Sequence, residues 1–255
     1  MKILLNSSKT MDFGRKEFSV KVCKDPVFKE NISFLSEILK DLSFDQIKKI
    51  TKTGDKLASD IMKIYKEFTC GKNKARLKPA LFAFSGDVYK EIDAKSYTKE
   101  DIEAAEKKII ILSGLYGALT PLTLIEPYRL EMGWDIGLGN YKKLSRFWKK
   151  DLTSLIEDIL KKDNEKTLIN LASKEYRDAL DTKDSNLSFT DIYFKEKKES
   201  ELKTVAVYSK KARGKMIDFI VKERVDNKED LKEFNGLGYV FDEKLSDDQS
   251  FYFVR

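Results

Sequence analysis

A chain of 255 residues with 41% hydrophobic and 36% charged residues has the composition of a globular protein and can bury a full core. Its formal net charge of +6 is too modest to indicate nucleic acid by itself, and no apolar run approaches the roughly 20 residues that span a bilayer. The two cysteines form no CxxC motif, and the apolar segment at residues 3–5 is too short for us to expect a signal peptide. The absence of histidine excludes Ser-His-Asp and Cys-His catalysis, HExxH zinc sites and facial-triad iron sites. We therefore expect a cytoplasmic protein with no membrane association, no cofactor and no metal site.

The first expected strand, residues 1–6, runs into a polar loop over residues 6–12. Lys9 stands in this loop between the hydroxyl residues Ser8 and Thr10. The donors resemble those of a phosphate-binding loop, but the glycines of a Walker motif are absent, so a Walker-type NTPase is rejected. The alternatives are a loop that contributes to a binding pocket and an ordinary turn after a strand.

A helix is expected over residues 27–42, because its apolar residues recur at helical spacing. Ser43 and Gln46 then form a capping-box pattern, with serine at the N-cap and glutamine three residues later. We therefore expect the next helix to begin at Phe44.

The segment at about residues 44–68 has the spacing of a helix-hairpin-helix element. Gly54 ends a tight turn whose amides can face a phosphate oxygen, although Lys52 stands where the motif usually has its first glycine. Residues 46–78 contain ten Lys or Arg and three Asp or Glu, a surface that suits sequence-independent phosphate contacts. The alternatives are a DNA-binding hairpin, with Lys56 beside the turn, and an ordinary lysine-rich pair of helices.

A short apolar run over residues 79–84 predicts a buried strand. Asp87 and Tyr89 follow just past its end, where functional groups of α/β sheets are commonly mounted. Thr98, with an aspartate three residues later, resembles a helix start. The next apolar run, residues 109–112, predicts another buried strand.

An irregular loop follows that strand, shaped by glycines and by two prolines. Arg129 and Glu131 are two residues apart, so in an extended segment they project from the same face. The alternatives for this loop are a binding or catalytic site that includes Tyr116 and Tyr128, and a structural salt bridge.

A helix is expected over residues 146–160 and a strand over residues 167–171. Polar side chains follow at the carboxyl end of that strand: Asn170, Ser173, Glu175 and Tyr176.

Further strands are expected over residues 189–194 and 204–208, and closing strands over residues 239–241 and 250–254. Cations gather near the predicted start of the helix that follows residue 208: Lys210, Lys211, Arg213 and Lys215. Cations are unfavourable at a helix N-terminus, so this cluster predicts a bound anion. The alternative is a set of exposed lysines screened by salt.

Several irregular motifs stand in order across nearly the whole chain: Asn6-Ser-Ser-Lys-Thr10 with Asp12, Gly86-Asp-Val-Tyr89, Leu112-Ser-Gly-Leu-Tyr-Gly117, Pro127-Tyr-Arg-Leu-Glu-Met-Gly133, Asn170-Leu-Ala-Ser173 with Glu175-Tyr176, Lys211-Ala-Arg-Gly214 and Gly238-Tyr239. Together they resemble the YaaA family of bacterial peroxide-stress proteins, long carried as a domain of unknown function. The chain departs from the family's usual residues at Ser7 and Ser8, which replace proline and alanine, and at Thr123, which replaces aspartate.

The resemblance implies a single compact domain over residues 1–255, of mixed α/β (α+β) class, with a mixed central sheet, surrounding helices and the embedded hairpin. It also implies a basic cleft that binds double-stranded DNA. The implied role is survival of hydrogen peroxide, through a lower level of free iron and therefore less damage to DNA.

The first functional hypothesis is a DNA-binding protein of the peroxide stress response. Its phosphate contacts would be sequence-independent and weaken with salt. The residues assigned to them are Lys52, Gly54, Lys56, Lys210, Lys211, Arg213 and Lys215.

The second hypothesis is an enzyme acting on a small phosphorylated or nucleotide-like substrate, which adds a small anionic ligand as a partner. Carboxylates with shifted pKa values can serve as acids and bases without histidine. The catalytic candidates are Lys9, Asp87, Arg129, Glu131 and Glu175. The pocket candidates are Ser8, Thr10, Tyr89, Tyr116, Tyr128, Asn170, Ser173 and Tyr176. A third hypothesis, direct iron binding, would have to do without imidazole and clustered cysteine ligands.

Overall fold

Parallel strands form the centre of a mixed sheet in the computed structural model, which describes residues 1–14, 23–163, 166–198 and 201–255. In sheet order they are β3 (Ile109–Ser113), β1 (Lys2–Asn6), β6 (Thr167–Asn170), β7 (Ser188–Lys198) and β10 (Ser250–Val254). Short antiparallel strands lie beside them: β4 (Gly117–Leu119) next to β3, β8 (Glu201–Lys203) next to β7 and β9 (Val240–Phe241) next to β10. A separate antiparallel pair joins β2 (Lys78–Pro79) to β5 (Leu124–Ile125).

Helices surround this sheet, so the chain has the mixed α/β fold that the sequence predicts. They are α1 (Lys29–Asp41), α2 (Phe44–Thr51), α3 (Asp55–Glu67), α4 (Ala80–Ala83), α5 (Asp87–Ile92), α6 (Lys99–Lys108), α7 (Leu144–Lys161), α8 (Lys174–Arg177) and α9 (Ala206–Lys222). Short 3-10 turns are η1 (Lys74–Arg76), η2 (Ala94–Ser96), η3 (Glu229–Glu233) and η4 (Gly236–Gly238). None of the helices in the described part of the chain is long and apolar enough to cross a membrane.

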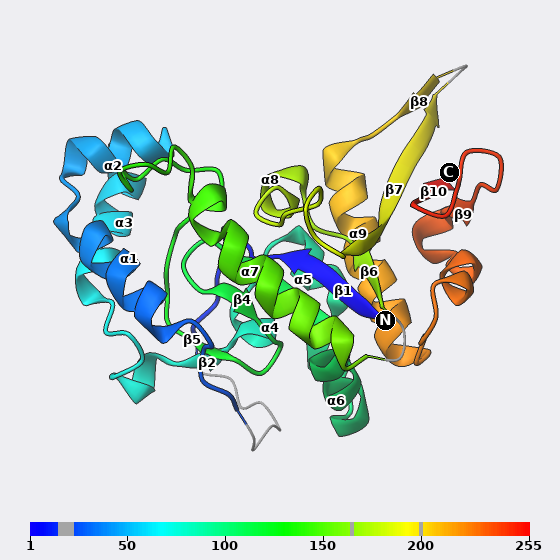
Figure 1. Cartoon of the computed structure of the whole chain (residues 1–255), viewed down its shortest axis with the longest axis horizontal. Helices are drawn as coiled ribbons and strands as arrows, with labels where there is room; N and C mark the ends of the chain where they lie inside the picture. The colour runs from blue at the N-terminus through cyan, green and yellow to red at the C-terminus, as the bar shows by residue number, and fades with distance from the viewer. Residues whose placement is uncertain (15–22, 164–165, 199–200) are drawn as a thin grey trace.

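The sheet is covered on both faces near its centre. Every residue of β3 is buried, which requires packing on both of its sides. Helix α7 packs against β4, while α6 packs against β1 and α9, and α5 packs against α9. Figure 1 shows α1, α2 and α3 together at one end of the long axis, with α9 on the other side of β1.

Local signals in the sequence place several elements correctly. Ser43 and Gln46 form the capping box that starts α2, and Thr98 with Asp101 forms the one that starts α6. The strands expected over residues 1–6, 109–112, 167–171, 189–194 and 250–254 correspond to β1, β3, β6, β7 and β10.

Two predicted strands are wrong. Residues 80–83 form α4 after the two-residue β2, because a short apolar run of alanine and leucine suits a buried helical turn as well as a strand. Residues 206–208 are already part of α9, and Val207 and Tyr208 are exposed rather than packed in a sheet. The lysines from Lys210 onward therefore lie beyond the first turn of α9, where the helix N-terminus does not disfavour cations.

Candidate functional site

The carboxyl ends of β1 and β6 meet where the order of the strands reverses. The chain leaves β1 toward β3 on one side, and it leaves β6 toward β7 on the other. Ligands of open α/β sheets commonly bind at such a point. Two contacts join the strand ends: the Ser173 N–H donates to Asn6 Oδ1 at 3.2 Å, and the hydroxyls of Ser7 and Tyr176 lie 3.2 Å apart.

Residues 126–133 connect the carboxyl ends of these strands. The Tyr128 hydroxyl lies 2.7 Å from Ser113 Oγ at the end of β3, and the Gly133 N–H donates to Glu175 Oε1 at 2.7 Å beyond β6. This crossing brings together a group of side chains that we call the strand-end cluster. Its members are Ser7, Lys9, Tyr128, Arg129, Glu131, Glu175 and Tyr176.

Glu131 is the central carboxylate of the strand-end cluster. It is 6% exposed, and its oxygens lie 3.6 Å from Lys9 Nζ and 3.8 Å from Arg129 Nε. These distances are too long for good hydrogen bonds. Burial raises the pKa of Glu131, and the charges of Lys9 and Arg129 only partly oppose this shift, which Glu175 reinforces.

Arg129 is held mainly through its backbone. Its carbonyl oxygen accepts a 2.6 Å hydrogen bond from the hydroxyl of Tyr65, which lies on α3. Its Nη1 donates to the Lys9 carbonyl at 3.4 Å, whereas its Nε is buried without a hydrogen-bond partner. The guanidinium therefore keeps hydrogen-bonding capacity beside Glu131.

The tyrosines predicted for the pocket are buried: Tyr89, Tyr116, Tyr128 and Tyr176. The Tyr89 hydroxyl donates to the Asn6 carbonyl at 3.1 Å, and the Tyr116 hydroxyl accepts the Glu126 N–H at 2.9 Å. Burial raises the pKa of each of these tyrosines, so they stay neutral near pH 7. They act here as neutral hydrogen-bonding groups.

Asn170 fixes the end of β6. Its Nδ2 donates to Asp191 Oδ1 at 2.7 Å and its Oδ1 accepts the Ala172 N–H at 3.1 Å. Both ends of the side-chain amide are therefore occupied by the protein. Ser173, three residues on, is half-buried and contributes its backbone N–H to the contact with Asn6.

The hydroxyl loop after β1 packs against the start of α5. Ser8 Oγ accepts the Thr10 N–H at 3.1 Å, and a Cβ on Gly86 would lie 2.2 Å from this oxygen. Thr10 itself is exposed, as is Asp87, the first residue of α5. Asp87 thus lies close to the loop but on its solvent side.

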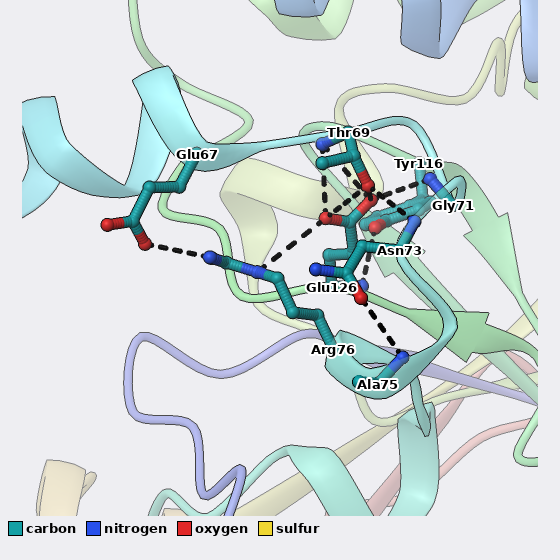
Figure 2. A network of polar contacts seen from close by, with 8 residues as sticks. All are labelled: Glu67, Thr69, Gly71, Asn73, Ala75, Arg76, Tyr116 and Glu126. Carbon is teal, nitrogen blue, oxygen red and sulfur yellow. Dashed lines mark hydrogen bonds and ion pairs between the residues drawn. The ribbon is translucent and has the colours of Figure 1, made fainter.

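Glu126 anchors the segment that carries Arg129 and Glu131, and it is not among the site residues predicted from the sequence. Its side chain is fully buried and accepts the Gly71 N–H at 2.6 Å and the Thr69 N–H at 3.1 Å. Figure 2 shows this network, in which Arg76 also approaches Glu126, with Nε at 3.9 Å. A charged residue beside a proline in an apolar stretch is the signal that could have revealed it.

Two packed helices, α2 and α3, occupy the segment where the helix-hairpin-helix element is predicted. Lys52 itself adopts the left-handed conformation, with φ 55°, at the position where the motif usually has glycine. Gly54 caps α3 with φ −72° and has open space where a Cβ would stand. Lys52 and Lys56 are exposed, whereas Lys48 forms an ion pair with Asp55.

The cations of α9 have different environments. Lys210 and Lys211 are exposed, while Lys215 Nζ lies 3.7 Å from Glu91 on α5. Arg213 is half-buried, its Nε has no hydrogen-bond partner, and burial lowers its pKa. In Figure 1, α9 and the α2–α3 hairpin lie on opposite sides of β1, so these cations do not adjoin those of the hairpin.

Carboxylates and thiols do not gather into a metal site in the described residues, where no three such side chains are close enough to hold an ion.

Known proteins are similar to this chain over nearly all of its length. The family model for the peroxide stress protein YaaA matches residues 1–245. A UPF0246 protein of Francisella tularensis subsp. tularensis (strain WY96-3418) is 37% identical over 256 residues, 100% of both chains. A UPF0246 protein of Francisella tularensis subsp. novicida (strain U112) is 39% identical over 231 residues, 90% of this chain and 91% of the relative. The chain therefore belongs to the YaaA family of peroxide stress proteins, as its irregular motifs predict.

Proposed function

We propose that this protein binds double-stranded DNA through the tip of the α2–α3 hairpin, as part of a cytoplasmic peroxide stress response. The observation that supports this most directly is the open tip, where Lys52 and Lys56 are exposed and the space beside Gly54 is empty. The N-terminus of α3, a helix of 13 residues, favours a phosphate there. Asp55 would oppose a phosphate, but its ion pair with Lys48 offsets that charge.

Membership of a peroxide stress family supports the biological side of this proposal. A role that combines DNA binding with the peroxide stress response is protection of the bound DNA from iron-dependent damage. The protein would act by occupying DNA through phosphate contacts, without reading its sequence.

Titration of a labelled duplex of about 20 base pairs at two salt concentrations tests the binding. Binding should weaken steeply with salt, and the double variant Lys52→Glu, Lys56→Glu should lose most of its affinity at low salt. The matched control is Lys90→Glu, Lys95→Glu, which changes the net charge equally at exposed lysines of another region. An unchanged affinity in the hairpin variant, or no binding at low salt, refutes the proposal.

A second candidate function is an enzyme acting on a small phosphorylated or nucleotide-like substrate. The observation that favours it is Glu131, a buried carboxylate whose pKa is raised and which stands beside Lys9 and Arg129. Such shifted groups concentrate at functional sites. The two cations would hold the anionic group while Glu131 exchanges a proton with the substrate.

Incubation with a panel of nucleotides and sugar phosphates, followed by phosphorus NMR, tests this candidate. Turnover should disappear in Glu131→Gln and persist in Lys90→Gln. A panel that stays intact with the wild-type protein argues against phosphoryl chemistry at this site.

A further inference from the structure

The strand-end cluster contains two cations that share a single close carboxylate. In the residues that the structure describes, Glu131 is the only acidic side chain within ion-pair distance of either Lys9 or Arg129. Neither contact is a close hydrogen bond, since the N–O distances are 3.6 and 3.8 Å. The pairing is therefore loose enough for another anion to displace it.

One donor for such an anion is exposed and a second has no hydrogen-bond partner. The Lys9 side chain is 64% exposed, so a ligand can reach its ammonium group from solvent. The Nε of Arg129 is buried and lacks a hydrogen-bond partner, which is costly unless a ligand supplies one. A guanidinium and an ammonium together suit a tetrahedral oxyanion, because charge-assisted hydrogen bonds to phosphate are strong.

Several elements contribute charged or titratable groups that face Glu131. Lys9 comes from the loop after β1, Arg129 and Tyr128 from its own segment, Glu175 and Tyr176 from α8, and Tyr65 from α3. The buried tyrosines remain neutral near pH 7. The charges of Lys9 and Arg129 balance those of the two carboxylates while Glu131 is ionised. Protonation of Glu131 leaves the cluster with one net positive charge.

We propose that the strand-end cluster binds the tetrahedral oxyanion of a small ligand, such as a phosphate group, and that Glu131 takes up one proton when the anion binds. This inference rests on the second candidate function for its location, but it requires binding only and no turnover. The anion replaces the Glu131 carboxylate as the partner of Lys9 and Arg129. The carboxyl group, left without cations in a buried position, then gains a proton from solvent.

Proton uptake has a defined consequence for affinity. If one proton binds with each anion, affinity rises by about tenfold for each unit that the pH falls, by linkage. The effect is confined to the interval between the pKa of Glu131 in the free protein and its higher pKa in the complex. That interval lies above the ordinary glutamate value of 4.5, because burial already raises the pKa in the free protein.

Inorganic sulfate is the probe for this test, because its own charge is constant between about pH 5 and pH 8, whereas a phosphate monoester titrates with a pKa of about 6. Calorimetry of the intact protein in two buffers with different ionisation enthalpies counts the protons taken up. The expected result is about one proton per sulfate, with tighter binding at the lower pH. Adenosine 5′-monophosphate and inorganic phosphate, measured in parallel, distinguish an ester from a free oxyanion.

Three variants assign the effect to the strand-end cluster. Glu131→Gln should bind sulfate with neither proton uptake nor dependence on pH, while Arg129→Gln should bind about tenfold more weakly or worse, the order expected for a lost charged hydrogen bond. Lys90→Gln should match the wild type. Circular dichroism checks that each variant is folded. If Arg129→Gln does not fold, Lys9→Gln replaces it in the test, because the Lys9 side chain is exposed.

The proposal is overturned if sulfate fails to bind at any pH, or if the dependence on pH persists in Glu131→Gln. Its failure can be told apart from that of the proposed functions. The Lys52→Glu, Lys56→Glu variant tests DNA binding alone and should retain sulfate binding. Sulfate binding without any turnover would remove the enzyme candidate and leave this inference standing.

Discussion

Gly114 places the end of β3 directly against the segment at residues 126–133. A Cβ on Gly114 would lie 2.3 Å from the Leu130 carbonyl oxygen, and its own carbonyl accepts the indole N–H of Trp148 at 2.8 Å. Because the backbone would have to move, Gly114→Ala should lower the free energy of unfolding by about 1–3 kcal/mol in urea denaturation. Gly54→Ala, which meets no atom within 4 Å, is the control and should cost less than about 1 kcal/mol. Equal losses would contradict the close approach.

Glu131 should make stability depend on pH in a definite direction. Its pKa is higher in the folded protein than the ordinary 4.5, so the folded state holds the proton more tightly than the unfolded state does. The free energy of unfolding therefore falls as the pH rises through the interval between 4.5 and the pKa of Glu131 in the folded protein. Glu131→Gln removes the buried charge and should be more stable than the wild type above the interval, by about 1.4 kcal/mol for each unit of pKa shift. Urea denaturation of both proteins at several pH values measures this. A difference that does not shrink as the pH falls toward 4.5 would exclude Glu131 as its source.

Among the elements, α3 and the loop after it are joined to residues 126–133 through Glu126. Glu126→Gln removes the negative charge and one of the two acceptor oxygens, so the N–H groups of Thr69 and Gly71 must share the remaining oxygen. We expect the free energy of unfolding to fall by about 1–3 kcal/mol and the Gly71 amide to exchange faster with deuterium. The control is Glu67→Gln, which breaks an exposed ion pair with Arg76 and should cost less than about 1 kcal/mol.

The sequence predicts elements well where local chemistry decides the conformation. The capping boxes of α2 and α6 satisfy backbone groups within four residues, so their signal is complete in the sequence. The strand predictions for the short runs at residues 79–84 and 204–208 are wrong, because packing decides between a strand and a helix there. Ala80, for example, is buried in a helical turn against β5, a contact that no local pattern encodes.

Over the whole molecule, the sequence identified charged residues of the strand-end cluster but not their arrangement. The spacing of Arg129 and Glu131, two residues apart, is sufficient to predict that their side chains lie together. The partnership of Glu131 with Lys9 spans 122 positions of the chain, and the burial of Glu126 depends on a loop 57 residues away. Such long-range contacts follow from the strand order, which the sequence pattern alone did not supply.

The two groups of lysines predicted to bind DNA, on the α2–α3 hairpin and on α9, lie apart on the molecule, so the length of a duplex decides whether it can contact both. The α2–α3 hairpin and α9 lie on opposite sides of β1 (Figure 1), and of the four α9 cations assigned to DNA from the sequence, Lys210 and Lys211 are the exposed ones. A duplex of about 10 base pairs, roughly 34 Å long, should therefore depend on the hairpin alone. Lys210→Glu, Lys211→Glu should leave its affinity unchanged and should weaken only duplexes long enough to reach α9. Fluorescence anisotropy with duplexes of increasing length measures this threshold. An equal loss at every length would mean that α9 belongs to the same contact surface as the hairpin, and a loss at no length would remove α9 from the DNA interface.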